Sequence, residues 1–215
     1  MSTIKLGING LGRIGRTVIR ELEKQKLQGK FKEIELVAVN NPGQAESFLR
    51  LIRRDSLHGQ FPGDVNFDGT RLNCGSSSMK FFNQRDPIEI DWSSENVDIV
   101  IDATGIFKDK AGLGKHLGGT VKKAIMCAPG KDLDATFVFG INHEDYDAAN
   151  HHIVSNASCT TNCLAPVAKV LHDAFGIEQG FMTTIHAYTG DQHLLDSNHS
   201  DPRRARAAAM SMIPT

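Results

Sequence analysis

The fold is decided close to the start of the chain by residues 4–16, which read IKLGINGLGRIGR. The stretch Ile4–Ile8, apolar at residues 4, 6 and 8, predicts a β-strand. Directly after it, Gly10, Gly12 and Gly15 form the pattern G-x-G-x-x-G and open a predicted helix, one face of which carries Ile14, Val18, Ile19 and Leu22. Such glycines let the backbone approach a pyrophosphate, which the first N–H groups of the helix attract. The order of strand, turn and helix favours a dinucleotide site over a glycine-rich connection without a ligand.

Short β-branched runs alternate with helical patterns along the rest of the first half, as in βαβ units with a mostly parallel sheet. Further strands are expected at residues 34–39, 97–101, 123–127, 137–139 and 152–154. A second helix is expected at residues 45–54, and loops with a short hairpin at residues 59–78. After Asn156 the pattern predicts a helix over Thr160–Phe175, a strand over Phe181–Tyr188 and a polar segment to Thr215.

Composition excludes several classes of protein. The 215 residues are 40% hydrophobic and 23% charged, so the chain is neither disordered nor fibrous. A formal net charge of −1 gives no overall basic field for nucleic acid or an anionic membrane, and the cluster Arg203–Arg206 is interpreted as a solvated or intersubunit loop. No apolar run reaches the roughly 20 residues of a membrane helix. Four cysteines without a cleavable signal segment indicate reduced thiols and a cytoplasmic protein.

The second pattern that carries chemistry is SNASCTTNC, residues 155–163. It leads from a predicted strand into a predicted helix, so Cys159 lies where N–H groups and the helix dipole favour a reactive thiolate. The alternative is a buried, inert cysteine. Cys163 lies one helical turn further on and lacks the spacing and the further ligands of a zinc site, so we expect it to pack within the helix and predict no metal site.

His186 is expected at the end of the strand predicted over residues 181–188, where it can face a helix N-terminus across a cleft. By itself it carries no specific signal. Four other histidines have no clear metal partner and are interpreted as surface or structural residues: His151, His152, His193 and His199.

The second predicted strand runs into Asn40 and Asn41, where an Asp or Glu usually holds the adenosine ribose. An amide does not repel a ribose 2′-phosphate as a carboxylate does. Asn41 also suits the start of a turn before Pro42. Both interpretations can hold together.

These stretches, with RDSLHG at residues 54–59 and TTIHAYT at residues 183–189, resemble the glyceraldehyde-3-phosphate dehydrogenase family over the entire chain. The resemblance implies a Rossmann-type, mostly parallel α/β domain over residues 1–157 and the first part of an α+β catalytic domain over residues 158–215. It implies that Cys159 is the nucleophile and His186 the base that activates it. The implied cofactor contacts are Gly10, Gly12, Arg13, Ile14, Gly15, Asn41, Arg85, Thr104 and Cys127. The implied substrate and phosphate contacts are Ser158, Thr160, Thr189, Asp191 and Arg204.

The activity implied by this resemblance is the oxidative phosphorylation of glyceraldehyde 3-phosphate to 1,3-bisphosphoglycerate through a cysteine thioester, in glycolysis or gluconeogenesis. NAD or NADP would be the cofactor, inorganic phosphate the second substrate and a homotetramer the parent assembly. One alternative is erythrose-4-phosphate dehydrogenase, which shares the thiol mechanism, although Thr189 favours the triose phosphate. The other is a fragment that binds a dinucleotide and catalyses nothing.

The sequence departs from the family pattern in three ways. Asn41 replaces the Asp usual in NAD-specific members and Ser197-Asn198 replaces a common Leu-Pro, so we expect NADP to be used comparably to NAD. Cys127 stands where Ser is common. The resemblance stops at Thr215, ahead of the family's remaining catalytic sheet and C-terminal helix, so we expect a C-terminally truncated chain that is inactive by itself.

Overall fold

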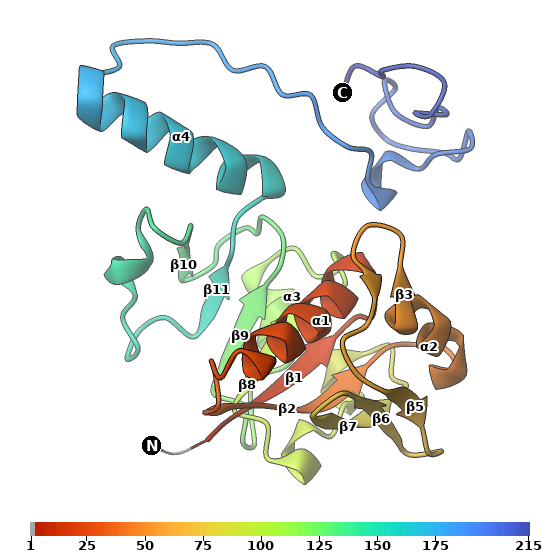
Figure 1. The fold of residues 1–215 in the computed structure, drawn as a ribbon. Helices are drawn as coiled ribbons and strands as arrows, with labels where there is room; N and C mark the ends of the chain where they lie inside the picture. Colours follow the sequence, from red (N-terminus) through yellow and green to blue (C-terminus); the bar gives the residue numbers. More distant parts are fainter. Residues whose placement is uncertain (1–2) are drawn as a thin grey trace. The chain divides into compact units, whose positions relative to one another are not determined.

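The computed structural model describes residues 3–215, which divide into two compact units (Figure 1). The first unit ends at Phe175 and the second comprises Gly176–Thr215. Each is described by itself, and the domain boundary predicted between residues 157 and 158 stays a prediction.

The first unit is built on a nine-stranded sheet with the order β10-β11-β9-β8-β1-β2-β7-β6-β5. Seven strands run parallel: β1 (Ile4–Asn9), β2 (Ile34–Asn40), β7 (Ser77–Phe82), β8 (Ile99–Asp102), β9 (Lys123–Met126), β10 (Ala135–Thr136) and β11 (Ile153–Ser155). The antiparallel strands β5 (Val65–Phe67) and β6 (Arg71–Cys74) extend the edge beyond β7, which confirms the predicted hairpin region. Two short strands, β3 (Arg54–Asp55) and β4 (Gly59–Gln60), pair separately.

Helices cover the sheet, and apolar side chains fill both of its faces. Three helices pack on the sheet, α1 (Arg13–Leu27), α2 (Ala45–Arg53) and α3 (Lys110–Gly114), whereas α4 (Cys159–Phe175) has no buried residue. Figure 1 shows α1 lying over the sheet, where Ile19 packs with Ile8 and Val39. On the opposite face Ala38 packs with Trp92, which belongs to the 3-10 turn η2 (Trp92–Glu95). Successive residues of a strand point to opposite faces, so one strand contributes to both clusters. The sheet is thus covered on both faces, as in other parallel α/β sheets. The expected Rossmann-type architecture is confirmed.

Two expected strands are wrong. The strand expected at residues 137–139 ends earlier, at Thr136, because the Asn142 side chain accepts the Val138 N–H at 2.9 Å and draws the chain into a turn. Residues 181–188 contain no strand in the described part of the chain, so His186 does not end one. A β-prone segment becomes a strand only where an open edge pairs with it, and residues 176–215, the unit to which this segment belongs, contain no other strand.

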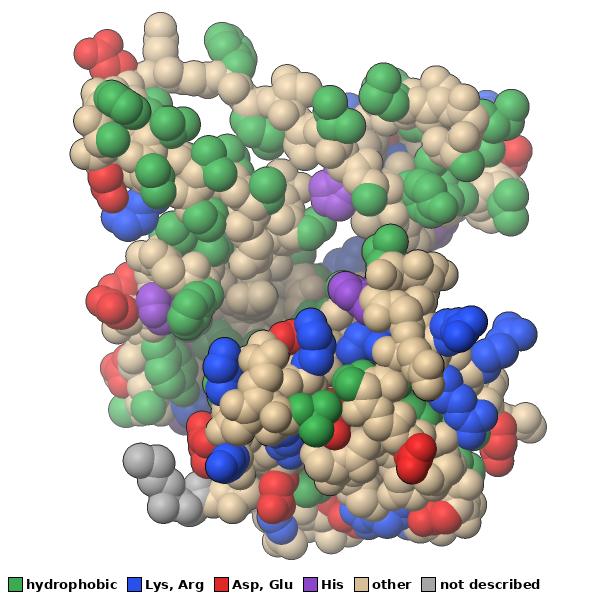
Figure 2. Space-filling model, in the orientation of Figure 1, with side chains coloured by type: hydrophobic (Ala, Val, Ile, Leu, Met, Phe, Trp, Pro, Cys, Tyr) green, Lys and Arg blue, Asp and Glu red, His purple; other side chains and the backbone are tan. Residues whose placement is uncertain are grey.

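The long helix predicted after Asn156 is confirmed as α4. Five of its large apolar side chains are exposed, because no other element of the first unit covers them. These are Leu164, Val167, Val170, Leu171 and Phe175. Figure 2 shows hydrophobic side chains spread over this helix. No helix within residues 3–215 is long and apolar enough to cross a membrane.

Candidate active site

The glycine turn joins β1 to α1 and leaves no room for a side chain at two of its positions. Gly10 has φ +99°, a conformation that favours glycine, and an added Cβ at Gly15 would lie 1.9 Å from the Gly10 carbonyl oxygen. At Gly12, which precedes α1, an added Cβ would meet nothing within 4 Å, and Gly12 gives α1 no side-chain cap. No cap side chain bonds the first N–H groups of α1, which leaves them suited to a phosphate.

Arg13 and Ile14, the predicted pyrophosphate contacts, begin α1 and are exposed. Arg13 Nη1 lies 3.0 Å from Asp55 Oδ2. The N–H groups of Leu57 and His58, followed by Arg13, hold the pKa of Asp55 well below its usual range. The segment of residues 54–59 thus presents a permanent anion that holds the Arg13 guanidinium beside the turn.

Asn41 lies just past β2 and is bonded to the glycine turn. Its Oδ1 accepts the Leu11 N–H at 2.8 Å, and its Nδ2 donates to the Pro42 carbonyl at 2.8 Å. The amide therefore closes a turn before Pro42, and it also places an uncharged side chain next to the predicted dinucleotide turn.

Thr104 and Arg85, the contacts predicted on the adenine side, and Cys127, a further predicted cofactor contact, lie beyond the carboxyl ends of β8, β7 and β9. Thr104 follows β8, and its Cγ2 lies 3.0 Å from where a Cβ on Gly10 would be. Cys127 follows β9, and its N–H donates to the Asp102 carbonyl at 2.9 Å. Arg85 is exposed, one residue beyond Gln84, whose carbonyl accepts from Asn40 at 2.9 Å. The carboxyl edge of a parallel sheet is where ligands bind in folds of this kind.

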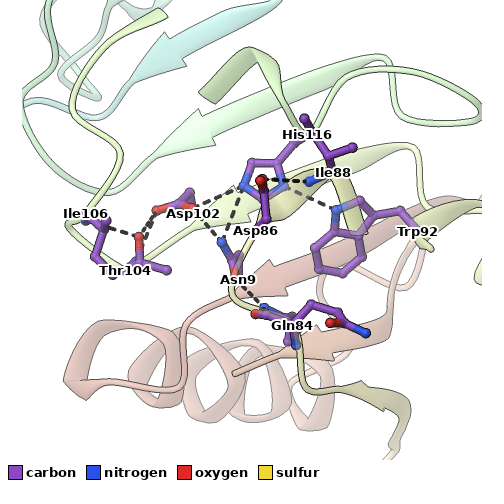
Figure 3. Close-up of polar contacts among 10 residues, drawn as sticks. Asn9, Gln84, Asp86, Ile88, Trp92, Asp102, Thr104, Ile106 and His116 are labelled. Atoms are coloured by element: carbon purple, nitrogen blue, oxygen red, sulfur yellow. Dashed lines mark hydrogen bonds and ion pairs between the residues drawn. The ribbon is translucent and has the colours of Figure 1, made fainter. Parts of the chain in front are cut away.

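Sequence reasoning missed a buried polar cluster at this edge (Figure 3). The His116 side chain is 0% exposed, and its Nε2 lies 3.2 Å from Asp102 Oδ2. Its Nδ1 accepts the Trp92 Nε1–H at 3.2 Å. One signal was present in the sequence: three of the parallel strands, β1, β2 and β8, end in Asn9, Asn40 and Asp102, although such strands need only apolar residues to pack.

Cys159 is the first residue of α4 and is exposed. Ser158 caps the helix, because its Oγ accepts the Thr161 N–H at 2.9 Å. Asn162 Nδ2 donates back to the carbonyls of Asn156 and Ser158 at 2.7 and 2.9 Å. Before the cap, Ala157 is buried and has φ +58°. A sharp strand-to-helix turn thus places the thiol at the positive end of the helix dipole.

The two cysteines elsewhere in the first unit lie in environments that suppress reactivity. Burial raises the pKa of the Cys74 thiol to about 12. Burial and the Asp102 carboxylate raise the pKa of Cys127 to about 11. Both remain protonated at neutral pH, where the thiol form is a poor nucleophile.

We therefore expect brief iodoacetamide treatment at neutral pH to alkylate Cys159 and to leave Cys74 and Cys127 unmodified. Peptide mass spectrometry of the labelled protein measures this directly. The variant Cys163→Ser serves as the control for the other cysteine of α4. Faster labelling of Cys127 than of Cys159 would contradict the environments described above.

Thr160 follows Cys159 in α4, and the second unit holds the remaining predicted residues. Thr189 caps the 3-10 turn η4 (Gly190–Gln192), and its N–H donates to Gln192 Oε1 at 2.8 Å. Asp191 pairs with Arg204, whose Nε also donates to Thr215 Oγ1 at 2.6 Å. The structure thus joins Asp191 to Arg204. His186 is exposed, with Nδ1 2.6 Å from the Ala187 carbonyl. Cys159 and His186 belong to different units, so their pairing stays a prediction.

A dinucleotide-binding α/β protein is the class that this fold and its glycine turn define. Residues 4–110 match the family model of the glyceraldehyde 3-phosphate dehydrogenase NAD binding domain, and residues 158–215 match that of its C-terminal domain. The chain belongs to the glyceraldehyde-3-phosphate dehydrogenase family.

Bacterial relatives match almost the whole chain. It is 49% identical over 211 residues to glyceraldehyde-3-phosphate dehydrogenase 1 of Bacillus cereus, covering 98% of this chain and 61% of the relative. It is 50% identical over 213 residues to glyceraldehyde-3-phosphate dehydrogenase of Xanthobacter flavus, covering 99% and 62%. The chain thus spans less than two thirds of the length of these curated relatives.

Proposed function

We propose that this chain carries the cofactor domain and the nucleophile of a cytoplasmic, phosphorylating glyceraldehyde-3-phosphate dehydrogenase. The observation that supports it most is the place of Cys159, exposed at the first turn of a capped helix that directly follows a strand of the dinucleotide-binding sheet. A thiol in that position is poised to attack a carbonyl carbon beside the cofactor.

The residues of the glycine turn fit a dinucleotide. Gly12 leaves open space in front of α1, while Gly10 and Gly15 keep the backbone free of side chains. In this proposal Arg13 and Ile14 contact the pyrophosphate, Asn41 the ribose, and Thr104 the adenine side. When bound, the nicotinamide accepts a hydride from the substrate.

The chain's own residues then perform the acyl chemistry. The Cys159 thiolate adds to the aldehyde carbon of glyceraldehyde 3-phosphate, and His186 takes the thiol proton. N–H groups at the start of α4 hold the developing oxyanion. After oxidation the acyl group is a thioester on Cys159, which inorganic phosphate cleaves to 1,3-bisphosphoglycerate and free thiolate. The phosphate groups would be held by Ser158, Thr160, Thr189, Asp191 and Arg204.

The test is steady-state kinetics of the protein expressed from its complete reading frame. We expect NAD reduction that requires both glyceraldehyde 3-phosphate and inorganic phosphate, with formation of an acyl phosphate. A higher kcat/KM with erythrose 4-phosphate would instead support the erythrose-4-phosphate dehydrogenase alternative. Dinucleotide binding without turnover of either aldehyde would support the inactive alternative. We extend the proposal to a homotetramer, for which sedimentation velocity is the measurement.

Replacing Asn41 with Asp is expected to weaken NADP binding by about tenfold or more and to change NAD binding by less than about threefold, because the new carboxylate repels the 2′-phosphate. Aspartate can still accept the Leu11 N–H but loses the donation to the Pro42 carbonyl, a change that acts on both cofactors alike. Isothermal titration with each cofactor measures the difference.

The matched control is Asn66→Asp, which adds the same charge on β5, where Asn66 Oδ1 accepts from Asn73 at 3.0 Å. It should leave both affinities unchanged. Equal weakening of both cofactors by Asn41→Asp would show that residue 41 does not discriminate between them.

A further inference from the structure

The carboxyl edge of the sheet contains a ladder of polar side chains on three adjacent strands. Asn9 of β1 is the register partner of both Asn40 of β2 and Asp102 of β8. Asn40 Nδ2 donates to Asn9 Oδ1 at 2.8 Å, and Asn9 Nδ2 donates to Asp102 Oδ2 at 2.8 Å. All three residues are at most 3% exposed. Burying this many polar groups is favourable only when each is paired, so the ladder is a specific arrangement.

His116 ends the ladder, and its hydrogen bonds define its tautomer. Trp92 Nε1 can only donate, so His116 Nδ1, 3.2 Å away, must accept. The ring proton therefore lies on Nε2, which donates to Asp102 Oδ2 at 3.2 Å. Figure 3 shows the imidazole held between the indole and the carboxylate. The nearby Asn9 Nδ2, 3.4 Å from Nε2, is a second donor aimed at the same carboxylate oxygen.

With this tautomer, Asp102 accepts hydrogen bonds at both oxygens. Oδ2 accepts from Asn9 and His116, while Oδ1 accepts the Thr104 N–H at 3.1 Å and the Thr104 hydroxyl at 2.7 Å. The carboxylate thereby holds the residue that borders Gly10 of the glycine turn. Backbone hydrogen bonds join the same three strand ends. Asn9 O accepts the Ala103 N–H at 2.8 Å, and Asn40 O accepts the Gly10 N–H at 2.8 Å.

We infer that His116 is a positioning residue for the dinucleotide site. Its hydrogen-bond partners, Trp92 and Asp102, are not themselves predicted cofactor contacts. Its Nε2–H completes the hydrogen bonds of Asp102, and Asp102 fixes Thr104 and, through Asn9, the strand end that opens the glycine turn. Without that donor the two sides of the site must be ordered when the cofactor binds, which weakens binding. The inference rests on the proposed function only in taking NAD as the ligand.

Two substitutions separate positioning from packing. His116→Gln can place an amide N–H where Nε2–H lies, so the bond to Asp102 is kept. His116→Asn can place an oxygen opposite Trp92 but offers no donor at the Nε2 position. We expect His116→Asn to weaken NAD binding by about tenfold or more and His116→Gln by less than about threefold, measured by isothermal titration of the full chain.

Nitrogen-15 NMR of the unsubstituted protein supplies a readout that needs no variant. Two-bond correlations of the His116 ring should show the proton on Nε2, and the chain's single tryptophan gives one indole N–H signal through which the ring is assigned. A proton on Nδ1, or on both nitrogens, would overturn the inference even where a variant fails to fold.

In a further outcome, the unsubstituted protein binds NAD while His116→Asn and His116→Gln bind it with affinities equal to each other, either unchanged or equally reduced. That outcome would also overturn the positioning role and leave the proposed function intact. Failure of the unsubstituted protein itself to bind NAD would overturn the proposed function, and the role of His116 with it.

Discussion

Replacing Cys159 with serine is expected to lower kcat for phosphate-dependent aldehyde oxidation by about a thousandfold or more, because a serine hydroxyl at the start of α4 is not ionised at neutral pH. The dissociation constant for NAD should change by less than about threefold, since Cys159 lies outside the glycine turn and only the covalent step needs sulfur. Turnover and isothermal titration on one preparation of the protein expressed from its complete reading frame separate the two effects.

Cys163→Ser is the matched control for this substitution. Cys163 lies one turn further along α4, and the same change there should leave kcat within about threefold, as expected for a residue away from reactive chemistry. If Cys159→Ser kept substantial phosphate-dependent activity, or if Cys163→Ser abolished it, the nucleophile would be misassigned.

The second large effect is expected at the glycine turn. Gly15→Ala would place a Cβ 1.9 Å from the Gly10 carbonyl oxygen, a backbone atom that cannot move without distorting the turn. We expect this variant to lose stability by about 1–3 kcal/mol and to weaken NAD binding by about a hundredfold or more.

Gly12→Ala is the sharper companion variant. The added Cβ meets no protein atom within 4 Å, and Gly12 has φ −65°, so the fold should keep its stability. If the pyrophosphate occupies the open space there, NAD binding still falls. Thermal unfolding and titration together separate the outcomes, and unchanged NAD affinity in Gly12→Ala would place the phosphates elsewhere.

The sequence predicted the parallel sheet because its strands are bounded by strong local signals. The G-x-G-x-x-G turn after Ile8 and the amphipathic spacing of α1 each act within a few residues. Phe137–Phe139 and Phe181–Tyr188 have similar apolar character but no such boundary. Whether each segment forms a strand depends on tertiary partners: the Asn142 side chain in the first case and a pairing edge in the second.

The candidate site likewise contains residues that a local sequence motif predicts and a residue that no motif predicts. Gly10, Gly15 and Cys159 belong to contiguous motifs, and their local conformations are those that the motifs predict. His116 has no motif, because its partners Trp92 and Asp102 lie 24 and 14 residues away in sequence. Only the strand order, which places β8 beside β1, brings Asp102 to Asn9 and explains why a buried histidine is needed there.

The left-handed backbone of Ala157 has a consequence for how the nucleophile is presented. An L-residue in this region costs about 1–2 kcal/mol relative to a right-handed one, and Ala157 is fixed there because its N–H donates to Ser155 Oγ at 2.9 Å while Ser155 donates to the Ala128 carbonyl at 2.6 Å. The folded chain therefore contains a small backbone strain two residues before Cys159. The chain passes from β11 into α4 through this hydrogen-bonded turn, so the backbone that carries the exposed Cys159 is positioned before any substrate arrives.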